Sequence, residues 1–133
     1  MKTKNNYWIV AGAINLFTFL LHLIGGQLDL INPMINSNLS IEEISQLIGA
    51  WHLVTLILLG SSIILLLAGF NKKFNTNLEL INIIGYLSLL FCIPFILSSF
   101  YYGLLVPQWI LFLPIGFFTL LGVSKSKKYT SGD

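Results

Sequence analysis

The stretch Ile48–Phe70, with the sequence IGAWHLVTLILLGSSIILLLAGF, decides the fold class because it runs without a charged side chain. An α-helix rises about 1.5 Å per residue, so about 20 apolar residues cross a bilayer core of about 30 Å. Three other stretches, at about residues 7–28, 80–100 and 104–123, are similarly long and uncharged. We therefore predict an all-α integral membrane protein, an antiparallel four-helix transmembrane bundle that forms one domain over residues 1–133.

The composition excludes several other classes of protein. Of the 133 residues, 56% are hydrophobic and only 9% are charged, against about 25% charged residues in ordinary soluble domains. All seven cations are lysines in short clusters, so we expect no nucleic-acid partner. The single cysteine, Cys92, cannot form an internal disulfide. The expected partner is the lipid bilayer, with further copies of the chain or a larger membrane complex as candidates.

The longest connection between the spans is the predicted outer loop at residues 29–47. It contains Asn32-Pro33, a pair typical of turns. Ser40 and Glu43 then match a capping box, in which two residues satisfy each other's free amides at the start of a helix. The second helix is therefore expected to extend into this loop from about residue 41. The other connections are short, which favours antiparallel packing of neighbouring helices.

Lysines gather at alternate ends of the predicted spans, and the outer loop has none. They are Lys2, Lys4, Lys72, Lys73, Lys125, Lys127 and Lys128. The positive-inside rule then places both termini in the cytoplasm. Aromatic residues are also expected to mark the membrane surfaces. These are Tyr7 and Trp8 on the inner side, and Trp51, Tyr101, Tyr102 and Trp109 on the outer side.

Two histidines fall inside the predicted spans, His22 in the first and His52 in the second. Counting the helical rise puts both about 8 Å below the outer boundary. Because the two helices are antiparallel neighbours, we expect the rings within direct or one-water hydrogen-bonding reach, or sharing one ligand. Ionisable groups inside a membrane indicate function by default. The candidate pocket at this level consists of His22, Gln27, Trp51, His52, Thr55, Ser98, Ser99 and Gln108.

Each predicted span carries one line of small or polar residues at helical spacing. The lines are Asn15, Thr18, His22, Gly25 and Gly26; Gly49, His52, Thr55 and Ser62; Asn82, Gly85, Cys92 and Ser99; and a face from Gln108 to Thr119. Small residues let helix backbones approach, and polar residues bond across helices. We expect these lines to face the interior of the bundle.

Several functions fit the polar cluster. The plainest is that its side chains only join helices near a wet interface. The leading functional hypothesis is a small binding or accessory subunit with an outward-facing pocket around His22 and His52. The alternative is a redox protein whose two histidines hold haem b or a transition metal, although zinc or copper would need more ligands.

Two other functions are less favoured by the sequence. An enzyme on an outer-leaflet substrate would need Ser98, Ser99 or Cys92 beside a histidine, and no catalytic residue is singled out. A proton or solute path is disfavoured because polar residues are scattered in the inner half. We therefore favour a non-enzymatic role.

The pair Leu21-His22 late in the first span and the run Trp51-His52-Leu53-Val54-Thr55 early in the second carry a family resemblance. The chain resembles small four-span bacterial membrane proteins that have no assigned activity. The resemblance covers chiefly the first half of the chain. It implies the same topology and a place in the bacterial cytoplasmic membrane, and it gives the two histidines no role.

Overall fold

The computed structural model describes residues 4–71 and 77–130, and all the regular structure in these ranges is helical. The elements are α1 (Asn6–Leu20), the π-helical segments η1 (Leu21–Gly25) and η2 (Gln27–Ile31), α2 (Asn32–Ile35), α3 (Ile41–Phe70), α4 (Leu78–Tyr102) and α5 (Gln108–Thr130). The first four elements follow one another as a single helical path. In the described ranges, four helices are thus long and apolar enough to cross a membrane, as predicted.

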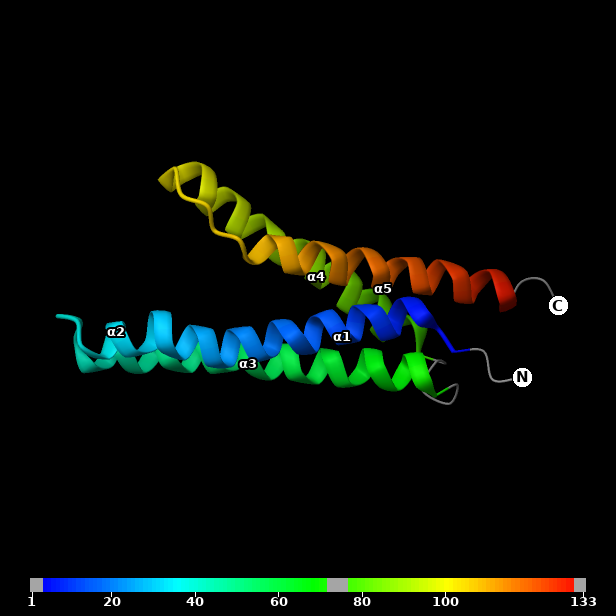
Figure 1. Ribbon diagram of the computed structural model, residues 1–133, viewed down its shortest axis with the longest axis horizontal. Coiled ribbons are helices and arrows are strands. Elements are labelled where there is room, and N and C mark those ends of the chain that lie inside the picture. The colour runs from blue at the N-terminus through cyan, green and yellow to red at the C-terminus, as the bar shows by residue number, and fades with distance from the viewer. Residues whose placement is uncertain (1–3, 72–76, 131–133) are drawn as a thin grey trace.

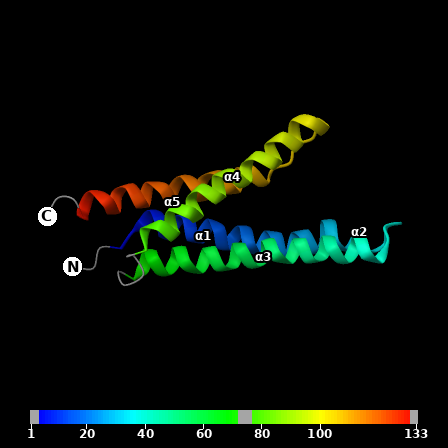
Figure 2. The same ribbon diagram turned by 180° about the vertical axis from the view of Figure 1, so that it is seen from behind.

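The helices form two antiparallel hairpins, α1 with α3 and α4 with α5, and the hairpins pack together mainly through α1 and α5. Both termini lie at one end of the molecule, which we call the terminal end (Figure 1). Towards the opposite end, the distal end, the two hairpins diverge, as the view from behind also shows (Figure 2). The predicted bundle is therefore closed at the terminal end and open at the distal end.

The terminal end is held by side chains from the start of the chain. Trp8 is fully buried, and its Nε1 donates to the carbonyl of Thr119 at 3.1 Å. The Nδ2 of Asn5 donates to the carbonyl of Gly122 at 3.1 Å and to Ser126 Oγ at 3.2 Å. These bonds join α1 to α5. The indole of Trp8 thus packs in the core at the terminal end, and its expected level at the inner membrane surface stays a prediction.

Glycines allow the helices to approach closely in the terminal half. A Cβ at Gly12 would lie 2.8 Å from Leu66 Cγ, and a Cβ at Gly85 would lie 2.7 Å from Leu120 Cδ2. Buried polar residues follow the predicted lines at the same level. They include Asn15, Thr18, Thr55, Ser62 and Thr119. The predicted interior lines are therefore confirmed in this half of the molecule.

The predicted outer loop is shorter than expected. The first helical path continues to Ile35, and Asn32-Pro33 lies within it, so the prediction of a turn at this pair is wrong. Ile31 and Asn32 before the proline have right-handed helical backbone angles, so the helical path continues through Pro33. The capping box is confirmed: the Ser40 amide donates to Glu43 Oε2 at 2.8 Å, and the Glu43 amide donates to Ser40 Oγ at 3.2 Å.

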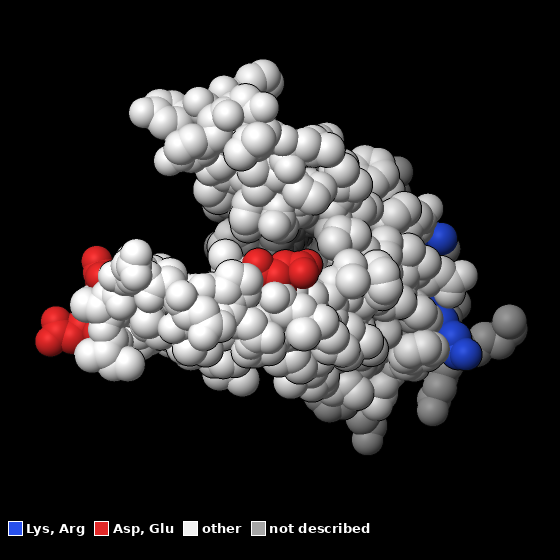
Figure 3. Space-filling model, turned by 60° about the vertical axis from the view of Figure 1, so that its left-hand side comes forward, with Lys and Arg blue, Asp and Glu red and all other residues white. Residues whose placement is uncertain are grey.

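Charge separates along the molecule in the way the sequence indicates. Figure 3 shows lysines at the terminal end and acidic groups at the opposite end, with a further acidic patch part-way along, beside the hollow between the two hairpins. Lys2, Lys72 and Lys73 lie outside the described residues. The placement of both termini in the cytoplasm stays a prediction.

Candidate functional site

The first helix changes its winding where it carries His22. Residues Leu21–Gly25 form a π-helical turn, in which the Gly26 amide reaches the carbonyls of both Leu21 and His22. A second such turn follows at Gln27–Ile31. Most π-helical turns are isolated insertions in α-helices, and they occur frequently at functional sites. Two consecutive turns therefore single out this part of the distal end.

The ring of His22 packs on the indole of Trp51 from α3. The ring centroids are 3.8 Å apart and the planes differ by 10°. The Nε2 of His22 also lies 3.2 Å from the Trp51 carbonyl oxygen. Because a carbonyl only accepts, this geometry requires Nε2 to carry the proton, and in the neutral ring Nδ1 is then an acceptor. The site thus holds one histidine by stacking and by a hydrogen bond.

Two neighbours complete this histidine–tryptophan pair. Thr55 is buried, and its Oγ1 donates to the same Trp51 carbonyl at 3.0 Å. Gly26 faces the indole so closely that a Cβ there would overlap the ring of Trp51. The indole can therefore lie between the two helices only because residue 26 has no side chain.

His52 takes a different place from the one expected. It follows Trp51 on α3, and its side chain is exposed. Within residues 4–71 and 77–130, no hydrogen bond joins the two histidines, and the aromatic partner of His22 is Trp51. The predicted contact of His22 with His52 is therefore not shown, and it stays a prediction.

The remaining candidates divide between the two hairpins. On the first hairpin, Gln27 Nε2 donates to Asn32 Oδ1 at 2.9 Å. On the second, Ser98 is half-buried and Gln108 is exposed. Ser99 Oγ donates to the Phe95 carbonyl at 2.8 Å. The divergence of the hairpins separates the two sets, so the structure does not assemble them into one pocket.

The nucleophiles expected beside a histidine, Ser98, Ser99 and Cys92, all lie on α4, whereas the two histidines lie on η1 and α3. Cys92 is buried, and its Sγ lies 3.6 Å from the Ser88 carbonyl oxygen and 3.7 Å from that of Trp109. No group of three or more His, Cys, Asp or Glu side chains that could hold a metal occurs in this part of the chain. A metal site here would have to rely on the two histidines.

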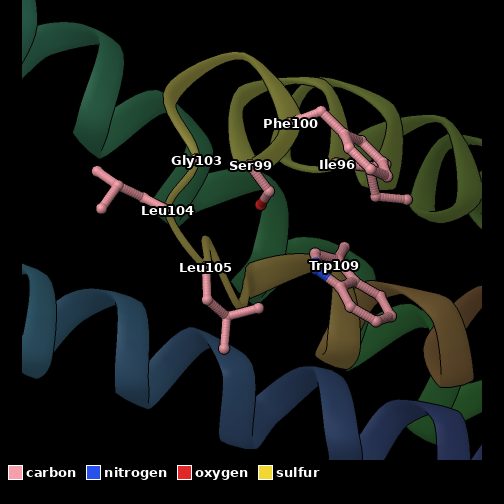
Figure 4. A pocket seen from close by; sticks show the side chains of 7 residues that line it. All are labelled: Ile96, Ser99, Phe100, Gly103, Leu104, Leu105 and Trp109. Atoms are coloured by element: carbon pink, nitrogen blue, oxygen red, sulfur yellow. The ribbon is translucent and has the colours of Figure 1, made fainter.

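A pocket at the tip of the second hairpin was not predicted. It has a volume of about 480 Å³ and lies between the end of α4, the connection to α5 and the first turn of α5 (Figure 4). Its lining residues are Ile96, Ser99, Phe100, Gly103, Leu104, Leu105 and Trp109. We call this the distal pocket. The sequence signal was the absence of charge from Leu80 to Ser124, which includes the connection itself.

Comparison with protein-family models, with curated proteins and with solved structures finds no match to this chain. No relative therefore supplies a function. The residues of the chain itself carry the proposals that follow.

Proposed function

We propose that the protein is a small membrane-embedded binding or accessory subunit of the bacterial cytoplasmic membrane, with a ligand site around His22 and His52 facing outward. The observation that supports it most is the stack of His22 on Trp51 within a π-helical turn. The stack and the bond to the Trp51 carbonyl hold the imidazole in one orientation. A fixed ring that keeps one nitrogen as an acceptor is suited to a ligand that presents a hydroxyl or an N–H.

His52 extends the same site towards the surroundings. Its exposed ring follows Trp51 on the same turn of α3, so a ligand that extends past the indole would meet a second imidazole. The partners proposed with this site are the bilayer and a larger assembly, formed either by copies of the chain or by another membrane protein.

Binding fits this geometry better than the redox alternative. Axial ligation of haem b by both histidines needs one free nitrogen on each ring with open space in front of it. In His22, Nε2 is engaged by the Trp51 carbonyl and one face of the ring is covered by the indole. Nε2, the ring nitrogen farther from the main chain, is therefore free for a haem iron only if the His22–Trp51 pair rearranges.

The test is to identify what the protein carries when it is extracted in membrane-derived nanodiscs. We expect mass spectrometry to detect a small molecule in the wild type that is absent from His22→Ala. The control is Gln108→Ala, which changes an exposed residue of the other hairpin and should keep the molecule. Equal contents in wild type and His22→Ala, with both variants helical by circular dichroism, would overturn the proposal. A Soret band lost in His22→Ala would favour haem instead.

A further inference from the structure

We propose that the distal pocket binds one phospholipid of the leaflet at the distal end, with an acyl chain against its apolar wall and an ester carbonyl at Trp109. This site lies on the α4–α5 hairpin and does not depend on the proposed role of His22. It assigns a lipid ligand to a part of the molecule that the candidate site leaves unused.

The walls of the distal pocket select an apolar ligand. Ile96 and Phe100 come from α4, and Leu104 and Leu105 come from the connection to α5 (Figure 4). The volume of about 480 Å³ falls within the range of about 300–1,000 Å³ that is typical of small-molecule sites. An uncharged hydrocarbon chain therefore matches the wall in chemistry and in size.

The polar groups of the pocket leave one hydrogen-bond donor to be satisfied. The hydroxyl of Ser99 already donates to the Phe95 carbonyl at 2.8 Å and accepts from the Val106 amide at 3.0 Å. The indole Nε1–H of Trp109 has no acceptor among the described residues, and Figure 4 shows this nitrogen on the side of the ring turned towards the connection. Indole is a donor only, so its partner must be an acceptor, such as the carbonyl of a fatty-acid ester.

The exposed apolar side chains of the connection between α4 and α5 indicate that the ligand comes from the bilayer. Phe100, Leu104 and Leu105 are 83%, 67% and 74% exposed. Contiguous apolar surface of this kind is unfavourable in water and marks a membrane or interaction site. No side chain from Leu80 to Ser124 is charged, so no charged group near the distal pocket is available to bind an ionic headgroup. The interaction is therefore with the ester and chain region that all phospholipids share.

The neighbouring tyrosines set the depth of this tip. Tyr101 and Tyr102 are exposed and their rings meet edge to face, with centroids 4.9 Å apart. Tyrosine is enriched at the level of the headgroups, where its ring is in the apolar region and its hydroxyl is hydrated. The distal pocket, whose lining residues Phe100 and Gly103 flank this pair, then lies at the depth of the ester groups.

The experiment uses the full chain in vesicles of phosphatidylglycerol that carries a diazirine on one acyl chain. After photolysis, we expect labelled peptides to come preferentially from residues 96–109. Native mass spectrometry after transfer to detergent should show one retained phospholipid per chain. Ile96→Trp fills the pocket and should abolish both signals. Its matched control, Ile93→Trp, changes an exposed residue on the same helix outside the pocket and should preserve them.

Trp109→Phe tests the ester contact separately from the apolar wall. Loss of one hydrogen bond should weaken retention about three- to tenfold while the labelled positions stay the same. Labelling spread evenly over all apolar faces, or equal retention in Ile96→Trp and Ile93→Trp, would overturn the proposal. A further test uses Leu105→Cys in a Cys92→Ala background. If two such chains form a disulfide and lipid is no longer retained, the occupant of the pocket is a second copy of the chain, and the proposal is overturned.

Discussion

Gly26 is the residue that allows the indole of Trp51 to lie flat against His22. Successive residues of an α-helix point about 100° apart, so Trp51 and His52 project in different directions from α3. The space above Gly26 accepts the indole, and His52 is turned outward. The choice between these two side chains is therefore made by a residue on the opposite helix.

We expect Gly26→Ala to displace the indole and to separate it from the imidazole. Overpacking of this kind costs about 1–3 kcal/mol. The change can be followed by the near-UV circular dichroism and fluorescence of Trp51 in a Trp8→Phe, Trp109→Phe background. Gly25→Ala is the control, because a Cβ there meets no atom within 4 Å. Identical spectra in the two alanine variants would contradict the stacked arrangement.

A second prediction at this scale concerns Trp8. The change Trp8→Phe removes the donor to the Thr119 carbonyl and leaves unfilled space in the core, so we expect the free energy of unfolding to fall by about 1–3 kcal/mol. The measurement is equilibrium unfolding in mixed detergent micelles. Phe17→Leu, at an exposed position of α1, should change it little. If Trp8→Phe lowered the free energy of unfolding as little as Phe17→Leu, the contact of Trp8 with α5 would contribute little to stability.

The sequence predicted His22 as a candidate site residue, but it did not predict that its ring would stack on Trp51. Spacing along a uniform α-helix indicates which residues share a face, and it assumes 3.6 residues in every turn. Each π-helical turn between Leu21 and Ile31 adds a residue, so the faces beyond it rotate. The stack of His22 on Trp51 depends on the space above Gly26, which follows the first of these turns, so no local pattern reveals it. The contact of His22 with His52 stays a prediction.

Among the elements, α3 has the best-defined start. The Ser40–Glu43 box could be predicted because all of its atoms come from four consecutive residues, and the structure confirms it. The extension of the first helix to Ile35 could not be predicted, because Asn32-Pro33 is compatible both with a turn and with a continuing helix.

Removal of this cap should loosen the first turns of α3. We expect Ser40→Ala to cost about 1 kcal/mol, the usual contribution of an N-cap side chain. Amide hydrogen exchange at residues 42–46 should accelerate accordingly. Ser45→Ala, which changes an exposed serine of the same helix, serves as control. Unchanged exchange in Ser40→Ala would mean that packing against the first helix, rather than the cap, orders this end.

The whole molecule has the shape of a fork, in which the two hairpins pack together at the terminal end and separate towards the distal end. The lines of small residues suggested close packing of all four helices along the entire length, and between the two hairpins this holds only for the terminal half. Gly12 and Gly85 meet side chains of neighbouring helices, whereas Gly25 and Gly49 have open space around them. A glycine permits close approach but does not bring a partner, so the sequence could not show where the bundle opens.

The arrangement of the ends gives a topological prediction. Glu42 lies near the start of α3, at the distal end, and Lys125 lies near the end of α5, at the terminal end. In a Cys92→Ala background, Glu42→Cys should react with an impermeant maleimide added outside intact cells, whereas Lys125→Cys should react only after permeabilisation. Labelling of both positions from outside would rule out the predicted orientation.

The fork also gives the protein unequal cross-sections at the two ends (Figure 1). If the hairpins spread further, the in-plane area of the protein grows mainly in the leaflet at the distal end. Lateral tension performs work in proportion to such an area change, so stretching the membrane favours the wider fork and compression favours the narrower one. Any change in the angle between the hairpins would therefore be coupled mechanically to the tension in one leaflet.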